Sequence, residues 1–167
     1  GSEMCIRDSL NGYQSTLMAP TEILAKQHYD TLYKFLAPLG VTIALLTGSQ
    51  TPAQKKQIRQ LIADGQIDVA VGTQALIQKS TRFSSLGLVI TDEQHRFGVG
   101  QRAALGSKGN EPHVLVMSAT PIPRTLGMII YGDLDISILD EMPKGRLPIR
   151  TYAVDTSYRE RLYRFIL

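Results

Sequence analysis

Two adjacent carboxylates, Asp92 and Glu93, follow directly on the apolar run from Leu86 to Thr91. Neighbouring side chains on an extended segment point in different directions, so the two acids can perform different tasks. One can hold a hydrated Mg²⁺, which prefers oxygen ligands and keeps most of its waters. The other can polarise a water molecule directed at a phosphate. An acidic pair is also a common polar strand end, so the pair alone leaves both interpretations open.

The residues around the pair favour the phosphate chemistry. The segment DEQH (residues 92–95) resembles the Walker B motif of superfamily-two helicases and translocases. The extension RFGV (residues 96–99) is similar to that of bacterial branch-migration and repair translocases. The resemblance implies that Asp92 holds Mg²⁺, that Glu93 activates the attacking water, and that His95 couples the nucleotide state to DNA.

The run before Asp92 predicts a strand that is buried on both faces, as in a parallel sheet, and ligands collect at the carboxyl ends of such strands. Further apolar runs predict strands at residues 13–18, 41–46, 67–71, 113–117, 135–139 and 149–154. Intervening patterns predict helices at residues 22–39, 52–64, 101–105, 125–131 and 158–166. This alternation predicts an α/β fold, a mostly parallel sheet with helices on both faces. The resemblance implies that the fold is of the RecA-like, P-loop NTPase type, without its first strand and P-loop.

Small and hydroxyl residues follow three of the predicted strands. The segment APTEILA (residues 19–25) resembles motif Ia of the same family, and GTQALI (residues 72–77) resembles motif Ib. Thr47-Gly48-Ser49 is either a close phosphate approach or a plain turn. The implied contacts to the DNA backbone are Pro20, Thr21, Gly48, Ser49, Gly72 and Thr73. Thr21 and Thr73 are also expected to cap the helices that follow them.

The apolar face of the first predicted helix and the basic face of the second are both expected to be structural and not functional. The apolar stripe of the first helix is predicted to contain Leu24, His28, Leu32 and Leu36, widened by Tyr29, Phe35 and Leu39. His28 is interpreted as a packed histidine at the edge of the core and not as a ligand. The basic residues of the second helix, Lys55, Lys56 and Arg59, are interpreted as a solvated surface.

Ser118-Ala119-Thr120 follows the predicted strand at residues 113–117 and precedes PIPRTL (residues 121–126). It resembles motif III, and the resemblance implies that Gln94, Ser118, Ala119 and Thr120 link the nucleotide site to the DNA-binding parts. Together with YGDLD (residues 131–135) and DEMPKGR (residues 140–146), the chain resembles the RecG family of ATP-dependent DNA helicases. Transcription-repair coupling factors share RFG and PIPRTL but are less similar at the last two segments.

The resemblance also divides the chain. Residues 1–10 have no periodic pattern and are expected to be a non-native leader, with a frayed native terminus as the alternative. Residues 11–142 are expected to be a partial first motor lobe, and residues 143–167 the linker and the start of a second lobe. The implied cofactors are ATP and Mg²⁺. The implied partners are branched or duplex DNA, together with the second motor lobe and a wedge domain of the same polypeptide.

No G-x-x-x-x-G-K-[ST] phosphate loop occurs in the sequence, so the chain alone is not expected to hydrolyse ATP. A non-enzymatic motor-lobe fragment is therefore the alternative to a helicase. A metal-dependent phosphohydrolase that uses Asp92, Glu93 and His95 is a third, disfavoured interpretation.

Composition narrows the remaining classes of protein. The chain has 167 residues, a net charge of +3, one cysteine and three histidines. One cysteine cannot form an internal disulfide, and scattered histidines give no zinc-ligand spacing. No apolar run approaches the roughly 20 residues that a membrane-spanning helix needs. The resemblance implies a bacterial cytoplasmic protein, without a membrane partner.

Overall fold

The computed structural model describes residues 4–5, 11–92, 108–109, 111–118, 135, 137–139, 151 and 153–166. The chain forms two compact units, Gly1–Pro121 and Ile122–Leu167, and each is described by itself. The predicted helices at residues 101–105 and 125–131 lie outside the described residues.

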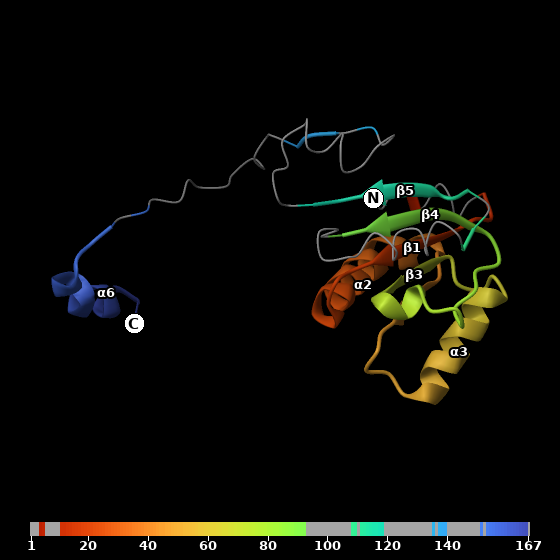
Figure 1. The fold of residues 1–167 in the computed structure, drawn as a ribbon, viewed down its shortest axis with the longest axis horizontal. Coiled ribbons are helices and arrows are strands. Elements are labelled where there is room, and N and C mark those ends of the chain that lie inside the picture. Colours follow the sequence, from red (N-terminus) through yellow and green to blue (C-terminus); the bar gives the residue numbers. More distant parts are fainter. Residues whose placement is uncertain are drawn as a thin grey trace. The chain divides into compact units, whose positions relative to one another are not determined.

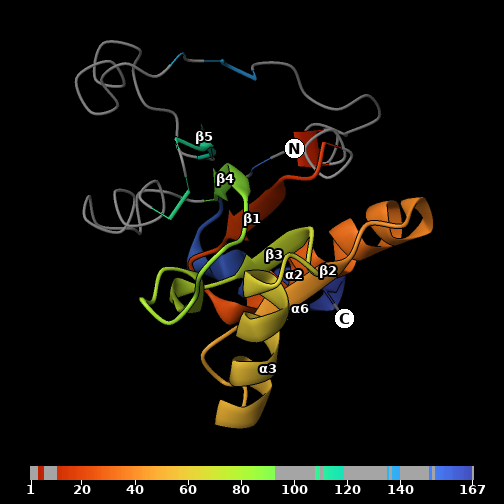
Figure 2. The same ribbon diagram turned by 90° about the vertical axis from the view of Figure 1, so that its right-hand side faces the viewer.

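The first unit contains a parallel five-stranded sheet (Figure 1). Its strands are β1 (Gln14–Met18), β2 (Ile43–Leu46), β3 (Val69–Gly72), β4 (Leu86–Thr91) and β5 (His113–Val116). Their order across the sheet is β2-β3-β1-β4-β5, which Figure 2 shows from the side. The predicted parallel α/β sheet is confirmed.

All five strands end in one row of the sheet. The last residues pair in the sequence Leu46–Gly72–Met18–Thr91–Val116 from one edge strand to the other. The segments that follow the strands therefore emerge along a single edge. This row brings the predicted functional segments, which are far apart in the sequence, to the same side of the molecule.

Local capping signals fix the two main helices, α2 (Glu22–Leu36) and α3 (Pro52–Ala63). The Thr21 hydroxyl accepts a hydrogen bond from the backbone N–H of Leu24, which confirms the predicted cap. Thr51 and Gln54 form a reciprocal capping box at the start of α3. A 3₁₀ helix, η1 (Ala37–Leu39), continues α2, and Gly40 ends it with a left-handed φ of 79°.

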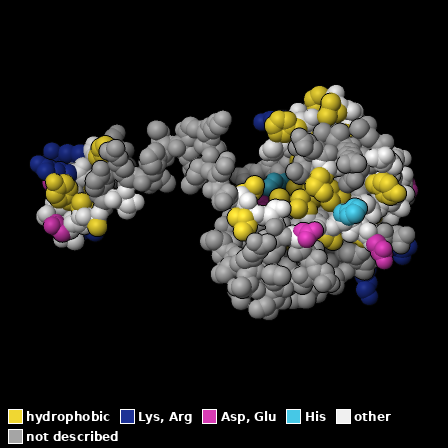
Figure 3. All heavy atoms as spheres, turned by 90° about the horizontal axis from the view of Figure 1, so that it is seen from above, with side chains coloured by type: hydrophobic (Ala, Val, Ile, Leu, Met, Phe, Trp, Pro, Cys, Tyr) yellow, Lys and Arg dark blue, Asp and Glu magenta, His cyan; other side chains and the backbone are white. Residues whose placement is uncertain are grey.

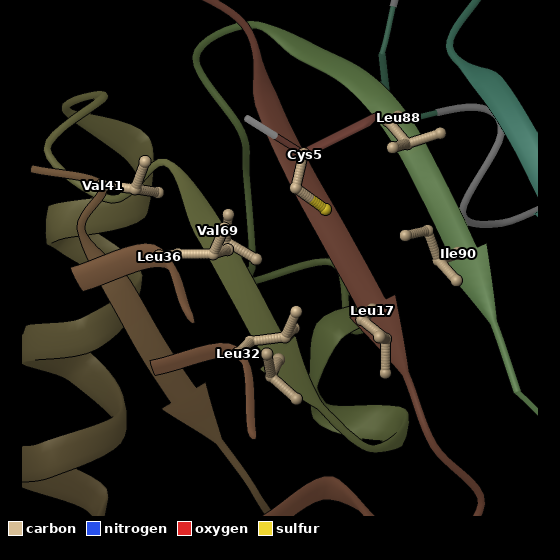
Figure 4. Packing of buried hydrophobic residues seen from close by; sticks show 9 residues of the cluster. Cys5, Leu17, Leu32, Leu36, Val41, Val69, Leu88 and Ile90 are labelled. Atoms are coloured by element: carbon tan, nitrogen blue, oxygen red, sulfur yellow. The ribbon is translucent and has the colours of Figure 1, made fainter. Parts of the chain in front are cut away.

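Hydrophobic side chains pack on both faces of the sheet, because adjacent strand residues point to opposite sides. The α2 face contains Cys5, Leu17, Leu32, Leu36, Val41, Val69, Val71, Leu88 and Ile90 (Figure 4). The α3 face contains Met18, Leu46, Ile62, Ala70, Ala75, Leu76, Leu86 and Val89. Cys5 is only 1% exposed, although it belongs to the expected leader; the origin of residues 1–10 stays a prediction.

Several predicted details are wrong. Phe35 and Leu39 are exposed by 64% and 59%, so they do not widen the buried stripe of α2. Large apolar side chains remain at the surface of the first unit, and Figure 3 shows such side chains beside acidic and histidine groups. β2 begins two residues later than predicted, because the Thr42 N–H donates to the Asp68 carboxylate at 2.7 Å.

The second unit has a 3₁₀ helix, η4 (Thr156–Tyr158), followed by α6 (Arg159–Ile166), as predicted for residues 158–166. The Asp155 carboxylate caps η4 by accepting a hydrogen bond from the Ser157 N–H at 2.8 Å. The strands predicted at residues 135–139 and 149–154 are wrong, because their described residues are not in strands. Among the described residues, no helix is long and apolar enough to cross a membrane.

Candidate nucleotide and DNA site

The strand-end edge gathers the described residues of the predicted site. The predicted DNA-contacting residues lie at or just after the ends of β1, β2 and β3, and Asp92 and Ser118 follow β4 and β5. Glu93, Gln94, His95, Ala119 and Thr120 lie outside the described residues. The roles assigned to these residues stay predictions.

Asp92 is held at this edge by its backbone and by a histidine. Its N–H donates to the carbonyl of Met18 at 3.0 Å, which extends the β1–β4 pairing by one residue. Because Leu88 and Ile90 pack on the α2 face, the alternation of the strand directs Asp92 to that face as well. There its Oδ2 lies 2.7 Å from Nε2 of His28, with side-chain exposures of 20% and 30%.

The position of His28 is consistent with a packed histidine at the edge of the core, and the structure adds a contact with Asp92 that was not predicted. His28 is partly exposed, and its ring hydrogen-bonds the carboxylate that the sequence assigns to Mg²⁺. Two sequence signals could have found the pair. The position of His28 in the helical repeat places it on the sheet-facing side of α2. Asp92 lies two residues after Ile90 and four after Leu88, so it is expected on the same face of the sheet as those residues.

The donor set at Asp92 fits Mg²⁺ better than a metal held by protein ligands alone. Among the described residues, no three His, Cys, Asp or Glu side chains form a metal-binding group. Mg²⁺ is usually held by one or two carboxylates together with waters and substrate phosphates. A single partly exposed carboxylate at a strand end meets that requirement, and the bound ion would neutralise charge on a nucleotide's phosphates.

A second cluster joins the start of α2 to the loop after β2. The Ser49 N–H donates to Glu22 Oε1 at 2.9 Å, and Lys55 Nζ donates to the Gly48 carbonyl at 2.8 Å. Hydrogen bonds from the Ser49 hydroxyl and N–H lower the pKa of Glu22 below its ordinary value. The two segments predicted to contact DNA thus lie side by side, but the Ser49 N–H already donates its hydrogen bond to the Glu22 carboxylate.

At the β3 end, Gly72 has a structural role and the cap predicted at Thr73 is absent. A Cβ on Gly72 would lie 2.1 Å from the carbonyl oxygen of Leu46, so the close approach of β2 already requires glycine here. Thr73 precedes the 3₁₀ helix η2 (Gln74–Leu76), but its side chain makes no capping hydrogen bond. Backbone bonding replaces the cap, since the Leu76 N–H donates to the Thr73 carbonyl at 3.0 Å.

The basic residues of α3 are not a uniform solvated surface. Lys56 is exposed, whereas Lys55 is tied to Gly48 and the Arg59 guanidinium donates to Thr81 Oγ1 at 3.2 Å. Lys108 donates to the carbonyls of Gln78 and Thr81. Burial and the nearby Arg59 lower the pKa of Lys108. Arg59 and Lys108 therefore hold the segment after η2, and Lys55 holds the loop after β2.

The parallel sheet, with the predicted functional segments at its strand-end edge, is that of a RecA-like lobe. The family model for the DEAD/DEAH box helicase matches residues 3–129, which is more than half of the chain. The chain belongs to the DEAD/DEAH box helicase family.

Within that family, the chain is similar to one segment of the ATP-dependent DNA helicase RecG. It is 56% identical to the Aquifex aeolicus protein over 156 residues, 52% to the Synechocystis protein over 155 and 51% to the Bacillus subtilis protein over 157. These matches cover 92%, 93% and 94% of the chain, respectively, but only 20%, 19% and 23% of the relatives. The chain thus spans about a fifth of their length.

A solved structure gives the same result. The structure of RecG bound to a three-way DNA junction matches with a TM-score of 0.76 and 45% sequence identity. The match covers 93% of this chain and 21% of that one. The resemblance to RecG and the RecA-like helicase lobe, both predicted from the sequence, are confirmed.

Proposed function

We propose that the chain is part of the first motor lobe of an ATP-dependent DNA helicase that remodels branched DNA, such as replication forks and Holliday junctions. The observation that carries this proposal is the common row of strand ends, which brings Asp92 and three predicted DNA-contacting segments to one edge. The similarity to a RecG that was solved on a three-way DNA junction supports the same conclusion.

The nucleotide chemistry is assigned to the β4 end. Asp92 holds Mg²⁺ through water, and Glu93 activates the water that attacks the γ-phosphate of ATP. His95 and Gln94 couple that step to Ser118, Ala119 and Thr120 after β5. The neighbouring position of β4 and β5 supports this coupling, because Thr91 pairs with Val116 just before both segments.

DNA contact is assigned to the other three strand ends. Pro20 and Thr21 present the start of α2, where backbone N–H groups and the helix dipole favour a phosphate. Gly48, Ser49, Gly72 and Thr73 extend this contact along the edge. The proposed partners also include a second motor lobe and a wedge domain in the same polypeptide, which acts in the bacterial cytoplasm.

The chain by itself is proposed not to be a competent ATPase. Phosphate cradling and the lysine contact to the β- and γ-phosphates come from a Walker A loop, which this sequence does not contain. The test compares binding of a fluorescent ATP analogue with Mg²⁺ to two proteins. One is the chain as it stands, and the other carries a strand and a G-x-x-x-x-G-K-T loop in place of residues 1–10.

Binding by the loop-bearing version alone supports the proposal, provided that Asp92→Asn weakens it and Asp64→Asn does not. Asp64 is a matched control, because it is an exposed acid at the end of α3. Tight binding by the unaltered chain contradicts the Walker A reasoning. ATP turnover by the unaltered chain that Glu93→Gln abolishes contradicts it as well.

A further inference from the structure

We infer that His28 is a positioning residue for the carboxylate of Asp92. This inference rests on the proposed role of Asp92 in holding Mg²⁺. It concerns a residue of α2, outside the DEQH segment, whose ring meets the carboxylate from 64 positions away in the sequence.

Rigid elements hold both partners. Asp92 follows the buried strand β4 and is fixed to β1 by its N–H bond to Met18. His28 lies in the middle of α2, whose first turn is fixed by the Thr21 cap and whose later residues Leu32 and Leu36 are buried against the sheet. The 2.7 Å contact is therefore set by the packing of α2 on the sheet and not by a flexible loop.

The chemistry of the contact assigns the direction of the hydrogen bond. An ionised carboxylate can only accept, so His28 Nε2 carries the proton and donates to Asp92 Oδ2. One oxygen of the carboxylate is thereby fixed, and the plane of the group is fixed with it. A hydrated Mg²⁺ needs only one oxygen from such a ligand, and Oδ1 is then presented in a defined direction.

Hydrogen bonds of this type are a general feature of metal-binding carboxylates. Removing the partner of a metal ligand typically lowers metal affinity by about 10- to 100-fold. Among the described residues, His28 is the one side chain that hydrogen-bonds the Asp92 carboxylate. Its removal should therefore produce an effect of this size.

The experiment uses the full chain and Mn²⁺ as a paramagnetic substitute for Mg²⁺. Bound Mn²⁺ is measured by electron paramagnetic resonance and by water-proton relaxation at millimolar metal, with Mg²⁺ as competitor. The variants are His28→Leu, His28→Gln and Asp92→Asn, and the control is His113→Gln, at the exposed first residue of β5. Circular dichroism and urea unfolding verify that each variant is folded.

We expect His28→Leu to weaken Mn²⁺ binding about 10-fold or more, and His28→Gln to recover most of it, because the glutamine amide can donate to Oδ2. His113→Gln should leave binding unchanged. Wild-type affinity in a folded His28→Leu variant overturns the inference, and so does a His28→Gln variant as weak as His28→Leu.

The Asp92→Asn variant separates a failure of the proposed role of Asp92 from a failure of the role of His28 alone. If Asp92→Asn binds Mn²⁺ as well as the unaltered chain, or the chain binds none that Mg²⁺ displaces, then Asp92 is not the metal ligand. That outcome overturns the role of Asp92 together with the inference. If Asp92→Asn abolishes binding while His28→Leu does not change it, only the role of His28 is refuted.

Discussion

Replacing Thr91 by valine is expected to stabilise the first unit. Thr91 is the last residue of β4 and is only 1% exposed. Among the described residues, it has the one buried side-chain polar atom without a hydrogen-bond partner, Oγ1. Its side chain points to the α3 face, where Val89 and Met18 pack. Valine has nearly the same shape, so Thr91→Val removes an unsatisfied hydroxyl without leaving a cavity.

The size of the effect follows from the burial of that hydroxyl. A buried polar group without a partner destabilises the folded state by about 1–3 kcal/mol, and burying a methyl group in its place contributes about 0.8 kcal/mol. Because a hydroxyl at a strand end relaxes more easily than one at the centre, we expect a gain of about 1–2 kcal/mol. With an m-value of about 2 kcal/mol/M, the urea midpoint should rise by about 0.5–1 M.

Thr16→Val is the matched control. Thr16 lies on the adjacent strand β1, is fully buried and faces the same side, but its Oγ1 donates to the Ala70 carbonyl at 3.1 Å. Losing that bond should lower the free energy of unfolding by about 0.5–1.5 kcal/mol. Urea unfolding followed by circular dichroism should therefore give shifts of opposite sign. A Thr91→Val variant that is no more stable than the unaltered chain, with an unchanged m-value, refutes the reasoning.

Three further outcomes are expected. Gly72→Ala should lower the free energy of unfolding by more than about 3 kcal/mol, because the new Cβ collides with a backbone carbonyl of β2; a midpoint near that of the unaltered chain contradicts this. Ser49→Ala should raise the pKa of Glu22 toward its ordinary value in an NMR titration, since the serine hydroxyl is the largest cause of its depression; an unmoved pKa assigns the shift to the backbone amide alone. Asp155 has a lowered pKa in the folded state, so its contribution to η4, the 3₁₀ turn that leads into α6, is complete above its ordinary pKa and is lost as the pH falls through the lowered value. Helicity at residues 159–166 should therefore decrease in acid, and Asp155→Asn should remove that dependence because asparagine caps without ionising.

Local signals in the sequence predicted most of the fold. The strand at residues 86–91 has the predicted bounds, because a continuous apolar run is typical of a strand that is buried on both faces in a parallel sheet. The start of α2 and the start of α3 follow from Thr21 and Thr51, whose hydroxyls bind N–H groups three residues later. Each of these predictions depends on neighbours in the sequence.

The contacts within the site could not be predicted in the same way. His28 meets Asp92 across 64 positions, and Glu22 meets Ser49 across 27. Both contacts depend on the register of the strands and on how α2 lies against the sheet, which no short segment encodes. Arg59 was misinterpreted for the same reason, because its partners Gln78 and Thr81 come from a different segment.

The helix α2 serves two proposed sites at once. Its first turn contains Thr21, which is assigned to DNA, and Glu22, which binds the loop after β2. His28, two turns later, binds the proposed Mg²⁺ ligand, about 10 Å along the axis at 1.5 Å per residue. Leu32 and Leu36 anchor the far end of the helix to the sheet. Because α2 is one continuous helix, a displacement of its first turn by DNA would also move the ring of His28. A DNA phosphate that displaces Glu22 from Ser49 would therefore act on the same rigid body that orients Asp92.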